Sequence, residues 1–203
     1  MSIEIKFSKN RIPYEKAMLF LNKRVQEVKN GNNKELIWIL EHPKIYTAGV
    51  SFKQNEIIDQ KIKVIKTSRG GKITLHNPGQ KIIYLVINLN KRKKDIRKLI
   101  GTLEKSIIKF LEIFKIQAKK DKKNIGIWVR DKKIAAIGLR VSHWVAFHGF
   151  SINISNNLKE YLKILPCGLD NKKITSIYAE RKFVPLNYEK KLVNILIKNI
   201  NRI

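Results

Sequence analysis

The sequence predicts an α/β fold, in which helices flank a mixed β-sheet. Residues 13–29 and 95–114 carry apolar side chains at helical spacing, which indicates two amphipathic helices. Short apolar or alternating segments between and after them are typical of strands, and some lie close enough together to form hairpins. No internal repeat and no linker rich in Ser, Pro or Gly divides the chain, so we expect a single domain over residues 1–203.

The N-terminal part of the chain predicts a helix between two strands. Residues 1–7 alternate between polar and apolar side chains, as a half-buried strand does, and contain no apolar signal-peptide core. The helix over residues 13–29 is followed by Gly31, which suits the left-handed position after a helix. Residues 36–40 are continuously apolar, which predicts a strand buried on both faces. We expect the next segment, residues 41–49, to be a loop.

The middle of the chain combines strands with a glycine-rich segment. A short strand starting at residues 64–65 leads into that segment, residues 69–80, and residues 82–88 are again typical of a strand. The helix over residues 95–114 follows, with seven apolar side chains on one face.

The C-terminal part predicts a hairpin that extends the sheet and a last helix. Residues 124–129 and 133–141 are two strands joined by a polar turn, and residues 145–154 form a third strand beside them. The last helix covers residues 187–200, and Asn187 is a suitable N-cap.

The composition limits the classes of function. The formal net charge of +27 comes mostly from lysines spread over nearly every polar segment, so it attracts acidic partners in general and identifies none. A nucleic-acid-binding protein stays open as an alternative, although no helix-turn-helix, zinc spacing or basic-aromatic motif supports one. No apolar run approaches the ~20 residues that span a bilayer. The single cysteine excludes an intrachain disulfide and suits the cytoplasm, and the four histidines show no metal-binding spacing.

Cys167, the only cysteine, lies between Pro166 and Gly168. Proline fixes φ and glycine permits unusual backbone angles, so the tripeptide predicts a tight turn that presents a thiol. Two interpretations are open: a buried, inert small side chain, and a reactive thiol in an environment that lowers its pKa.

Two further segments contain candidate binding residues. Gly70 and Gly71 permit close approach of a ligand to the backbone, and Thr74 and His76 lie two residues apart, so that both point to one side of a strand. The alternatives are a ligand-binding loop and a plain glycine hairpin with a hydrogen-bonded histidine.

Lys133 opens a segment of small and apolar residues, 133–138, along which a substrate can lie against the backbone. A partly buried ammonium group there would stabilise a neighbouring thiolate, although most lysines of this chain are surface charges. His148 shares the apolar face of its strand, so we expect a core histidine with one hydrogen-bond partner.

Five motifs, in order along the chain, resemble the octanoyltransferases of lipoate biosynthesis. They are Glu41-His42-Pro43 with Tyr46-Thr47-Ala48-Gly49, residues 69–80, residues 133–138, His148-Gly149-Phe150 with Asn153, and Pro166-Cys167-Gly168 with Thr175-Ser176. Two positions depart from the family pattern: Leu75 replaces a usual aromatic residue, and Asn77 stands where glycine is common.

The resemblance implies a fold like the catalytic module of biotin and lipoate protein ligases. It implies transfer of an octanoyl group from octanoyl-acyl carrier protein to a lysine on lipoyl domains, namely those of 2-oxoacid dehydrogenase acyltransferase subunits and the glycine cleavage H protein, without a cofactor. Cys167 would be the nucleophile that forms an acyl thioester, and Lys133 would lower its pKa. The implied substrate-binding residues are Arg69, Gly70, Gly71, Lys72, Ile73, Thr74, Leu75, His76, Ala136, Ile137, Gly138, Gly149, Phe150 and Ser151.

The nearest alternative is an ATP-dependent lipoate or biotin ligase on the same fold. Such an enzyme would form an acyl-adenylate and would not need a covalent cysteine, so the Pro166-Cys167-Gly168 turn argues against it.

Overall fold

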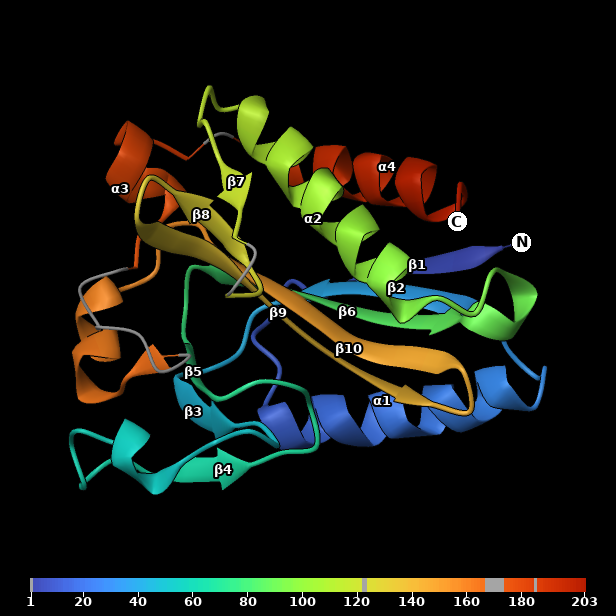
Figure 1. The fold of residues 1–203 in the computed structure, drawn as a ribbon, viewed down its shortest axis with the longest axis horizontal. Helices are drawn as coiled ribbons and strands as arrows, with labels where there is room; N and C mark the ends of the chain where they lie inside the picture. Colours follow the sequence, from blue (N-terminus) through green and yellow to red (C-terminus); the bar gives the residue numbers. More distant parts are fainter. Residues whose placement is uncertain (1, 122–123, 167–173, 185) are drawn as a thin grey trace.

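A seven-stranded sheet lies between two layers of helices in the computed structural model, which describes residues 2–121, 124–166, 174–184 and 186–203 (Figure 1). Its strand order is β1-β2-β6-β10-β9-β8-β7; β1 and β2 are parallel and the other neighbours are antiparallel. A three-stranded sheet, in the order β4-β3-β5, lies beside it. These sheets and helices confirm the expected α/β class with mixed pairing.

The strands are β1 (Ile3–Phe7), β2 (Glu35–Leu40), β3 (Ile45–Ala48), β4 (Val64–Lys66), β5 (Ile73–His76), β6 (Gln80–Asn88), β7 (Lys119–Lys120), β8 (Ile127–Val129), β9 (Lys132–Ser142) and β10 (Val145–Asn153). The α-helices are α1 (Tyr14–Lys29), α2 (Ile96–Glu112), α3 (Ile177–Arg181) and α4 (Tyr188–Ile200), and the 3₁₀ helices are η1 (Gln54–Glu56), η2 (Leu89–Lys91) and η3 (Leu158–Lys163).

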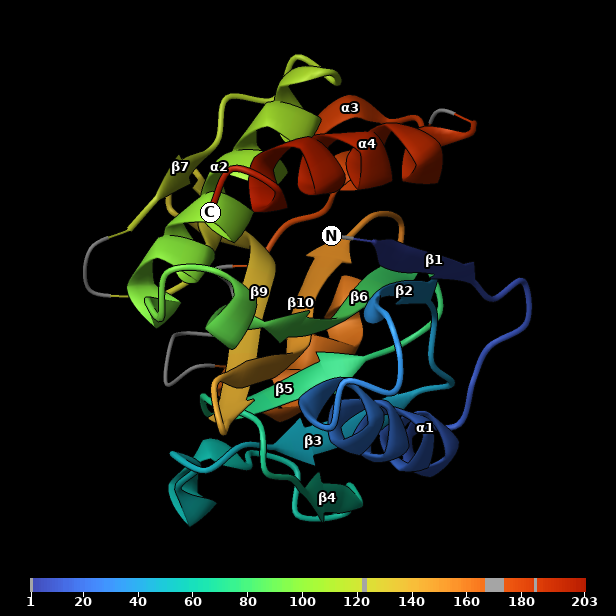
Figure 2. The same cartoon turned by 90° about the vertical axis from the view of Figure 1, so that its right-hand side faces the viewer.

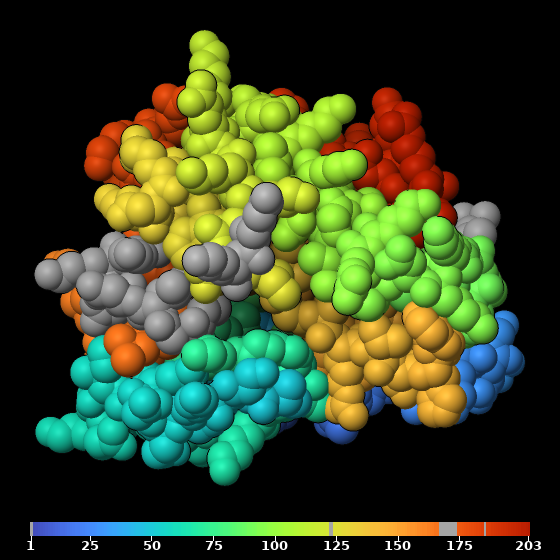
Figure 3. Space-filling view, viewed as in Figure 1, coloured from blue at the N-terminus to red at the C-terminus, as the bar shows by residue number. Residues whose placement is uncertain are grey.

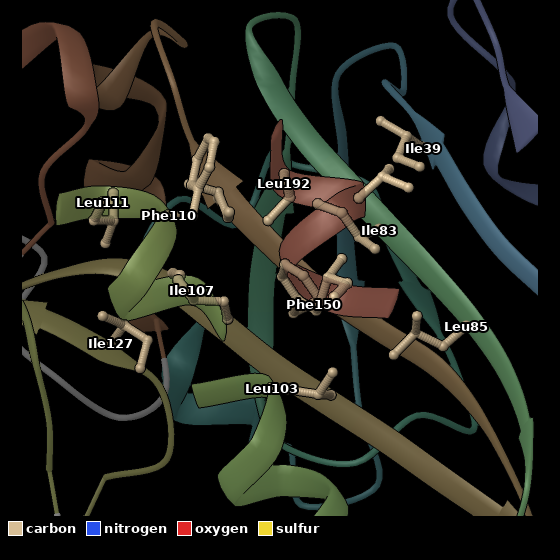
Figure 4. Close-up of a cluster of buried hydrophobic side chains, with 14 of the residues drawn as sticks. Ile39, Ile83, Leu85, Leu103, Ile107, Phe110, Leu111, Ile127, Phe150 and Leu192 are labelled. Atoms are coloured by element: carbon tan, nitrogen blue, oxygen red, sulfur yellow. The ribbon is translucent and has the colours of Figure 1, made fainter. Parts of the chain in front are cut away.

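The helices cover opposite faces of the large sheet, α1 on one face and α2 with α4 on the other (Figure 2). Strand β6 shows why, because its side chains alternate: Ile83 and Leu85 pack beneath α2 and α4, whereas Tyr84 packs toward α1. Figure 4 shows Ile83 and Leu85 with side chains of α2 and α4 in the larger cluster. Each fully buried large apolar side chain stabilises the fold by about 1.5–3 kcal/mol.

The ends of the helices follow the sequence signals in most cases. Asp95 precedes α2 and its carboxylate accepts a hydrogen bond from the Lys98 N–H at 2.9 Å, as an N-cap does. Gly31, just after α1, has the expected positive φ of 78°. Asn187 precedes α4 as expected, but its own φ is 56° and its side chain makes no capping hydrogen bond. Asn187 therefore occupies the predicted N-cap position, but its side chain does not contribute a capping hydrogen bond.

The expected loop over residues 41–49 is wrong in part, because Ile45–Ala48 form β3, the central strand of the small sheet. Strand β3 pairs with β4 in parallel and with β5 in antiparallel fashion. Four residues are too few for a clear local pattern, and their partners come from later in the chain. This small sheet places the glycine-rich segment opposite the edge of β9.

Candidate active site

A cavity of about 60 Å³ lies between the glycine-rich segment and strands β9 and β10, and we call it the main cavity because most of the predicted substrate-binding residues line it. The surface is hollowed between the cyan-to-green part of the chain and its yellow-to-orange part (Figure 3). Every predicted substrate-binding residue except Leu75 lines the main cavity. The remaining lining residues are Tyr14, Ile82, Tyr84 and His148.

Leu75 lies on the other side of its strand. Thr74 and His76 line the main cavity on the same side of β5, as their spacing predicts. Leu75 is fully buried in a separate cluster with Tyr46 and Tyr161, under the small sheet. The departure from the family pattern at Leu75 therefore lies in this cluster, outside the lining of the main cavity.

Backbone contacts hold the glycine-rich segment in place. The Arg69 guanidinium donates to the Thr47 carbonyl at 2.6 Å and to its hydroxyl at 2.9 Å, which ties the segment to β3. The Gly70 N–H donates to the Leu139 carbonyl at 3.2 Å, on the edge of β9. A Cβ at residue 70 would lie 2.8 Å from that carbonyl oxygen, so this close approach requires glycine.

His76 is buried and its ring is held by Gln80, whose Oε1 lies 2.8 Å from Nδ1. Burial, together with the neighbouring His42, lowers the pKa of His76 to about 3. The ring is consequently neutral at pH 7. A neutral imidazole with so low a pKa fits a binding or orienting role and is a weak proton acceptor.

His148 differs from the expected core histidine. It has a φ of 64° in the middle of β10, and its ring stacks on that of Phe147 at a centroid distance of 4.9 Å. Neighbouring side chains of a regular strand point to opposite faces, so the left-handed conformation brings the His148 ring beside its neighbour. The ring lines the main cavity, and within the described residues its buried Nε2 has no hydrogen-bond partner. The expected single partner is therefore wrong. Burial first, then Arg69 and Arg140, lower the pKa of His148 to about 4.

Lys133 lies on β9 and only 3% of it is exposed. Its Nζ donates to the Ile125 carbonyl at 3.1 Å and lies 5.0 Å from the centroid of the Trp128 ring. Gly126, with a φ of 136°, makes room for the lysine, because a Cβ there would lie 3.0 Å from the Lys133 Cε. The fold thus brings a cationic group into the protein interior.

A second, small cavity of about 10 Å³ shares Thr74, Ala136 and Ser151 with the main cavity. Lys133 and Pro166 also line this small cavity. Cys167 follows Pro166 directly in the sequence, and it lies outside the described residues. Lys133 and the residue before Cys167 thus flank one space that adjoins the main cavity.

Polar residues behind β10 hold this region together. The Gln80 side chain donates to Asn153 Oδ1 at 2.8 Å, and the Asn153 amide in turn donates to the Thr175 carbonyl at 3.0 Å. The Thr175 N–H donates to the Lys133 carbonyl at 3.0 Å. A chain of hydrogen bonds therefore links β6 and β10 to the strand that positions Lys133.

The described residues contain neither a cluster of side chains suited to a metal ion nor a helix suited to crossing a membrane. No group of three or more His, Cys, Asp or Glu side chains in this part of the chain is arranged to hold a metal ion. None of the helices described here combines the length and the apolar character that crossing a bilayer demands.

Comparison with known proteins identifies the family. Residues 13–194 match the lipoyl protein ligase A/B catalytic domain. The chain is 40% identical to an octanoyltransferase of Wolbachia sp. subsp. Brugia malayi, over 99% of both chains. It is 42% identical to an octanoyltransferase of Ehrlichia chaffeensis, over 86% of this chain and 85% of the other.

Solved structures share the fold at low sequence identity. Lipoate-protein ligase A bound with ATP has a TM-score of 0.73 at 14% identity, over 98% of this chain and 85% of that one. A bi-partite lipoate protein ligase of Thermoplasma acidophilum, studied with its E2 lipoyl domain, has a TM-score of 0.70 at 14% identity, over 100% and 83% of the chains. Biotin protein ligase of Aquifex aeolicus has a TM-score of 0.52 at 14% identity, over 99% and 68%. The chain belongs to the lipoyl protein ligase A/B catalytic-domain family and, within it, to the octanoyltransferases, which are acyltransferases.

Proposed function

We propose that the chain transfers an octanoyl group from octanoyl-acyl carrier protein to the ε-amino group of a lysine on a lipoyl domain, through a thioester on Cys167. The acceptors are the lipoyl domains of 2-oxoacid dehydrogenase acyltransferase subunits and the glycine cleavage H protein. The observation that carries the proposal is the small cavity, where the buried Lys133 meets Pro166 beside the main cavity. A reducing cytoplasm suits an enzyme that depends on a free thiol.

The first step forms the acyl-enzyme. A free thiol has a pKa of ~8.5, so only a small fraction is thiolate at neutral pH, and a nearby ammonium such as Lys133 raises that fraction. The Cys167 thiolate attacks the donor thioester, a new C–S bond forms, and the bond to the carrier sulfur breaks. The proton of Lys133 passes to the departing carrier thiolate. One thioester replaces another, so the step requires no ATP.

Attack on the thioester forms a tetrahedral intermediate, whose oxyanion needs a hydrogen-bond donor. Of two neighbouring backbone N–H groups on β9, those of Gly138 and Leu139, the geometry favours Leu139. The Leu139 carbonyl accepts from Gly70 at the outer edge of β9, and the N–H and C=O of one strand residue point to the same side. The Leu139 N–H therefore points toward the glycine-rich segment, whereas the neighbouring Gly138 N–H points toward β10. A fixed backbone N–H at this edge is suited to stabilising the tetrahedral intermediate.

The second step releases the acyl group to the acceptor. The neutral acceptor amine attacks the thioester carbonyl, an amide forms, and the Cys167 thiolate leaves. Lys133, which gave up its proton in the first step, takes the proton of the attacking amine. We assign this role to Lys133 because a pKa of about 3 makes His76 a poor proton acceptor.

The main cavity offers an apolar wall to an eight-carbon chain. Ile137 and Phe150 belong to its lining. Each methylene that leaves water contributes ~0.8 kcal/mol to binding. Acyl length therefore has a large effect on affinity.

Mass spectrometry of the intact protein tests this function. Incubation with octanoyl-carrier protein is expected to add one octanoyl group to Cys167, and a lipoyl domain added afterwards is expected to remove it. Cys167→Ala is expected to abolish both the adduct and turnover. Turnover that requires ATP and survives in Cys167→Ala would instead support a ligase. Tight, salt-sensitive RNA binding without any acyl transfer would support a nucleic-acid-binding protein.

A further inference from the structure

Residues 49–59 contact two separate parts of the candidate active site. At one end, the Val50 and Ser51 N–H groups donate to carbonyls of the glycine-rich segment, at 3.1 Å each. At the other end, the Ile58 and Asp59 N–H groups both donate to the Lys163 carbonyl, at 3.0 and 3.1 Å. Glu56 lies between these two sets of contacts.

The Glu56 side chain is bound to the glycine-rich segment. Only 3% of the residue is exposed. One carboxylate oxygen forms an ion pair with Lys72 Nζ at 3.0 Å, and the other accepts from the Ile73 N–H at 3.4 Å. A buried carboxylate is stable only with such partners, so Glu56 fixes both the Lys72 side chain and the start of β5.

The Glu56 backbone is bound to the segment that precedes the predicted nucleophile. Its carbonyl accepts from the Leu165 N–H at 2.8 Å, and the next residue, Ile57, forms an antiparallel bridge with Ile164. Pro166, one residue further, lines the small cavity with Lys133. Glu56 thus contacts both regions: its side chain contacts the glycine-rich segment, and its backbone contacts the segment that precedes Cys167.

We propose that Glu56 is a positioning residue that couples the glycine-rich segment to residues 163–165. It sets the position of the glycine-rich segment relative to the residues that precede Cys167 in the chain, and its consequence for catalysis rests on the proposed function. Glu56 contacts neither the main nor the small cavity, so it acts through Lys72, Ile73 and Leu165.

Hydrogen exchange of Glu56→Gln measures this coupling without reference to any activity. Glutamine keeps the size and an acceptor for Ile73, but it removes the charge that pairs with Lys72. Amide exchange is expected to become about tenfold faster in residues 69–74 and also in residues 163–165. Faster exchange in only one of these two segments, or in neither, overturns the proposal.

Glu35→Gln is the matched control. Glu35 is also a buried carboxylate, 4% exposed, and both of its oxygens pair with Arg92 at another part of the fold. This variant is expected to lose stability, as Glu56→Gln does, while exchange in the two active-site segments stays at the wild-type rate. Faster exchange there in Glu35→Gln as well would mean that general destabilisation accounts for the effect.

Single-turnover octanoylation of Cys167 gives the catalytic readout. At a temperature where all variants are folded, Glu56→Gln is expected to slow acylation about tenfold, because small displacements of reacting groups are costly. Lys72→Gln is expected to slow it similarly, and the double variant no further than either single one. A wild-type rate in Glu56→Gln overturns the positioning role. Absence of the adduct in the wild type refutes the proposed function instead, and the exchange experiment still decides the coupling.

Discussion

At the scale of single residues, three buried basic side chains line the two cavities in different surroundings. Lys133 Nζ donates to a carbonyl and lies near an aromatic ring, whereas burial lowers the pKa values of His148 and His76, so that both rings are neutral at pH 7. The proposed chemistry uses Lys133, while the neutral rings shape the wall of the cavity. The sequence indicated the importance of Lys133 and His76 through motifs. It gave no sign of the conformation of His148, which depends on strand neighbours far along the chain.

Replacing Lys133 is expected to change the pH dependence of acylation. In Lys133→Ala the Cys167 thiol loses a neighbouring cation, so its pKa rises and the pH–rate profile of adduct formation moves to higher pH. Quench-flow measurements from pH 6 to pH 10 check the shift. Lys132→Ala, one residue earlier on β9, serves as the control and should keep the wild-type profile. An unshifted profile in Lys133→Ala would remove this lysine from the proposed role.

His148 is expected to make stability depend on pH. The unfolded state binds a proton near pH 6.5 and the folded state only near pH 4, so the free energy of unfolding decreases as pH falls through this interval. The contribution is about 3 kcal/mol. His148→Asn keeps a residue that tolerates the left-handed conformation but removes the titrating group, so its unfolding free energy should decrease less between pH 7 and pH 4. Urea denaturation at both pH values measures the difference, and equal decreases in the two proteins would contradict the prediction.

At the scale of elements, the strands and helices with long periodic patterns were predictable, and the short paired ones were not. Helices α1 and α2 and strands β2, β6 and β10 lie close to their expected ranges, because burial on one or both faces leaves a pattern in the local sequence. Strand β3 has four residues and was expected to be a loop, since its stability comes from pairing with β4 and β5. The same limit applies to Glu56, whose partners are identified only by the fold.

The junction of β6 and β10 should depend on Gly149. A Cβ at this residue would lie 1.9 Å from the Ile83 carbonyl oxygen, so Gly149→Ala forces the two central strands apart. We expect a loss of several kcal/mol in the free energy of unfolding, measured by chemical denaturation. Gly101→Ala provides the contrast, because outside the neighbouring backbone of α2 no atom lies within 4 Å of the added Cβ, and alanine there should stabilise the protein by about 0.5–1 kcal/mol. A similar effect of both substitutions would contradict this view of the junction.

At the scale of the whole molecule, the net charge of +27 should act on encounter rates. If the donor and acceptor proteins are acidic, attraction accelerates their association, and salt screens it over a Debye length of ~8 Å at 0.15 M. The second-order rate of acyl transfer from octanoyl-carrier protein should therefore fall as salt rises from 50 to 500 mM. Transfer from a small neutral octanoyl thioester should change little over the same range. Equal salt dependence for both donors would show that the surface charge does not steer the partner.

The part of β9 that β8 leaves unpaired contributes main-chain groups to the candidate active site. Strand β8 pairs with β9 only as far as Ala135, and beyond that point the backbone of β9 faces the glycine-rich segment and the main cavity. Main-chain groups are the same whatever side chains a genome favours. The contribution of these main-chain groups to the site is therefore compatible with a surface that carries many lysines.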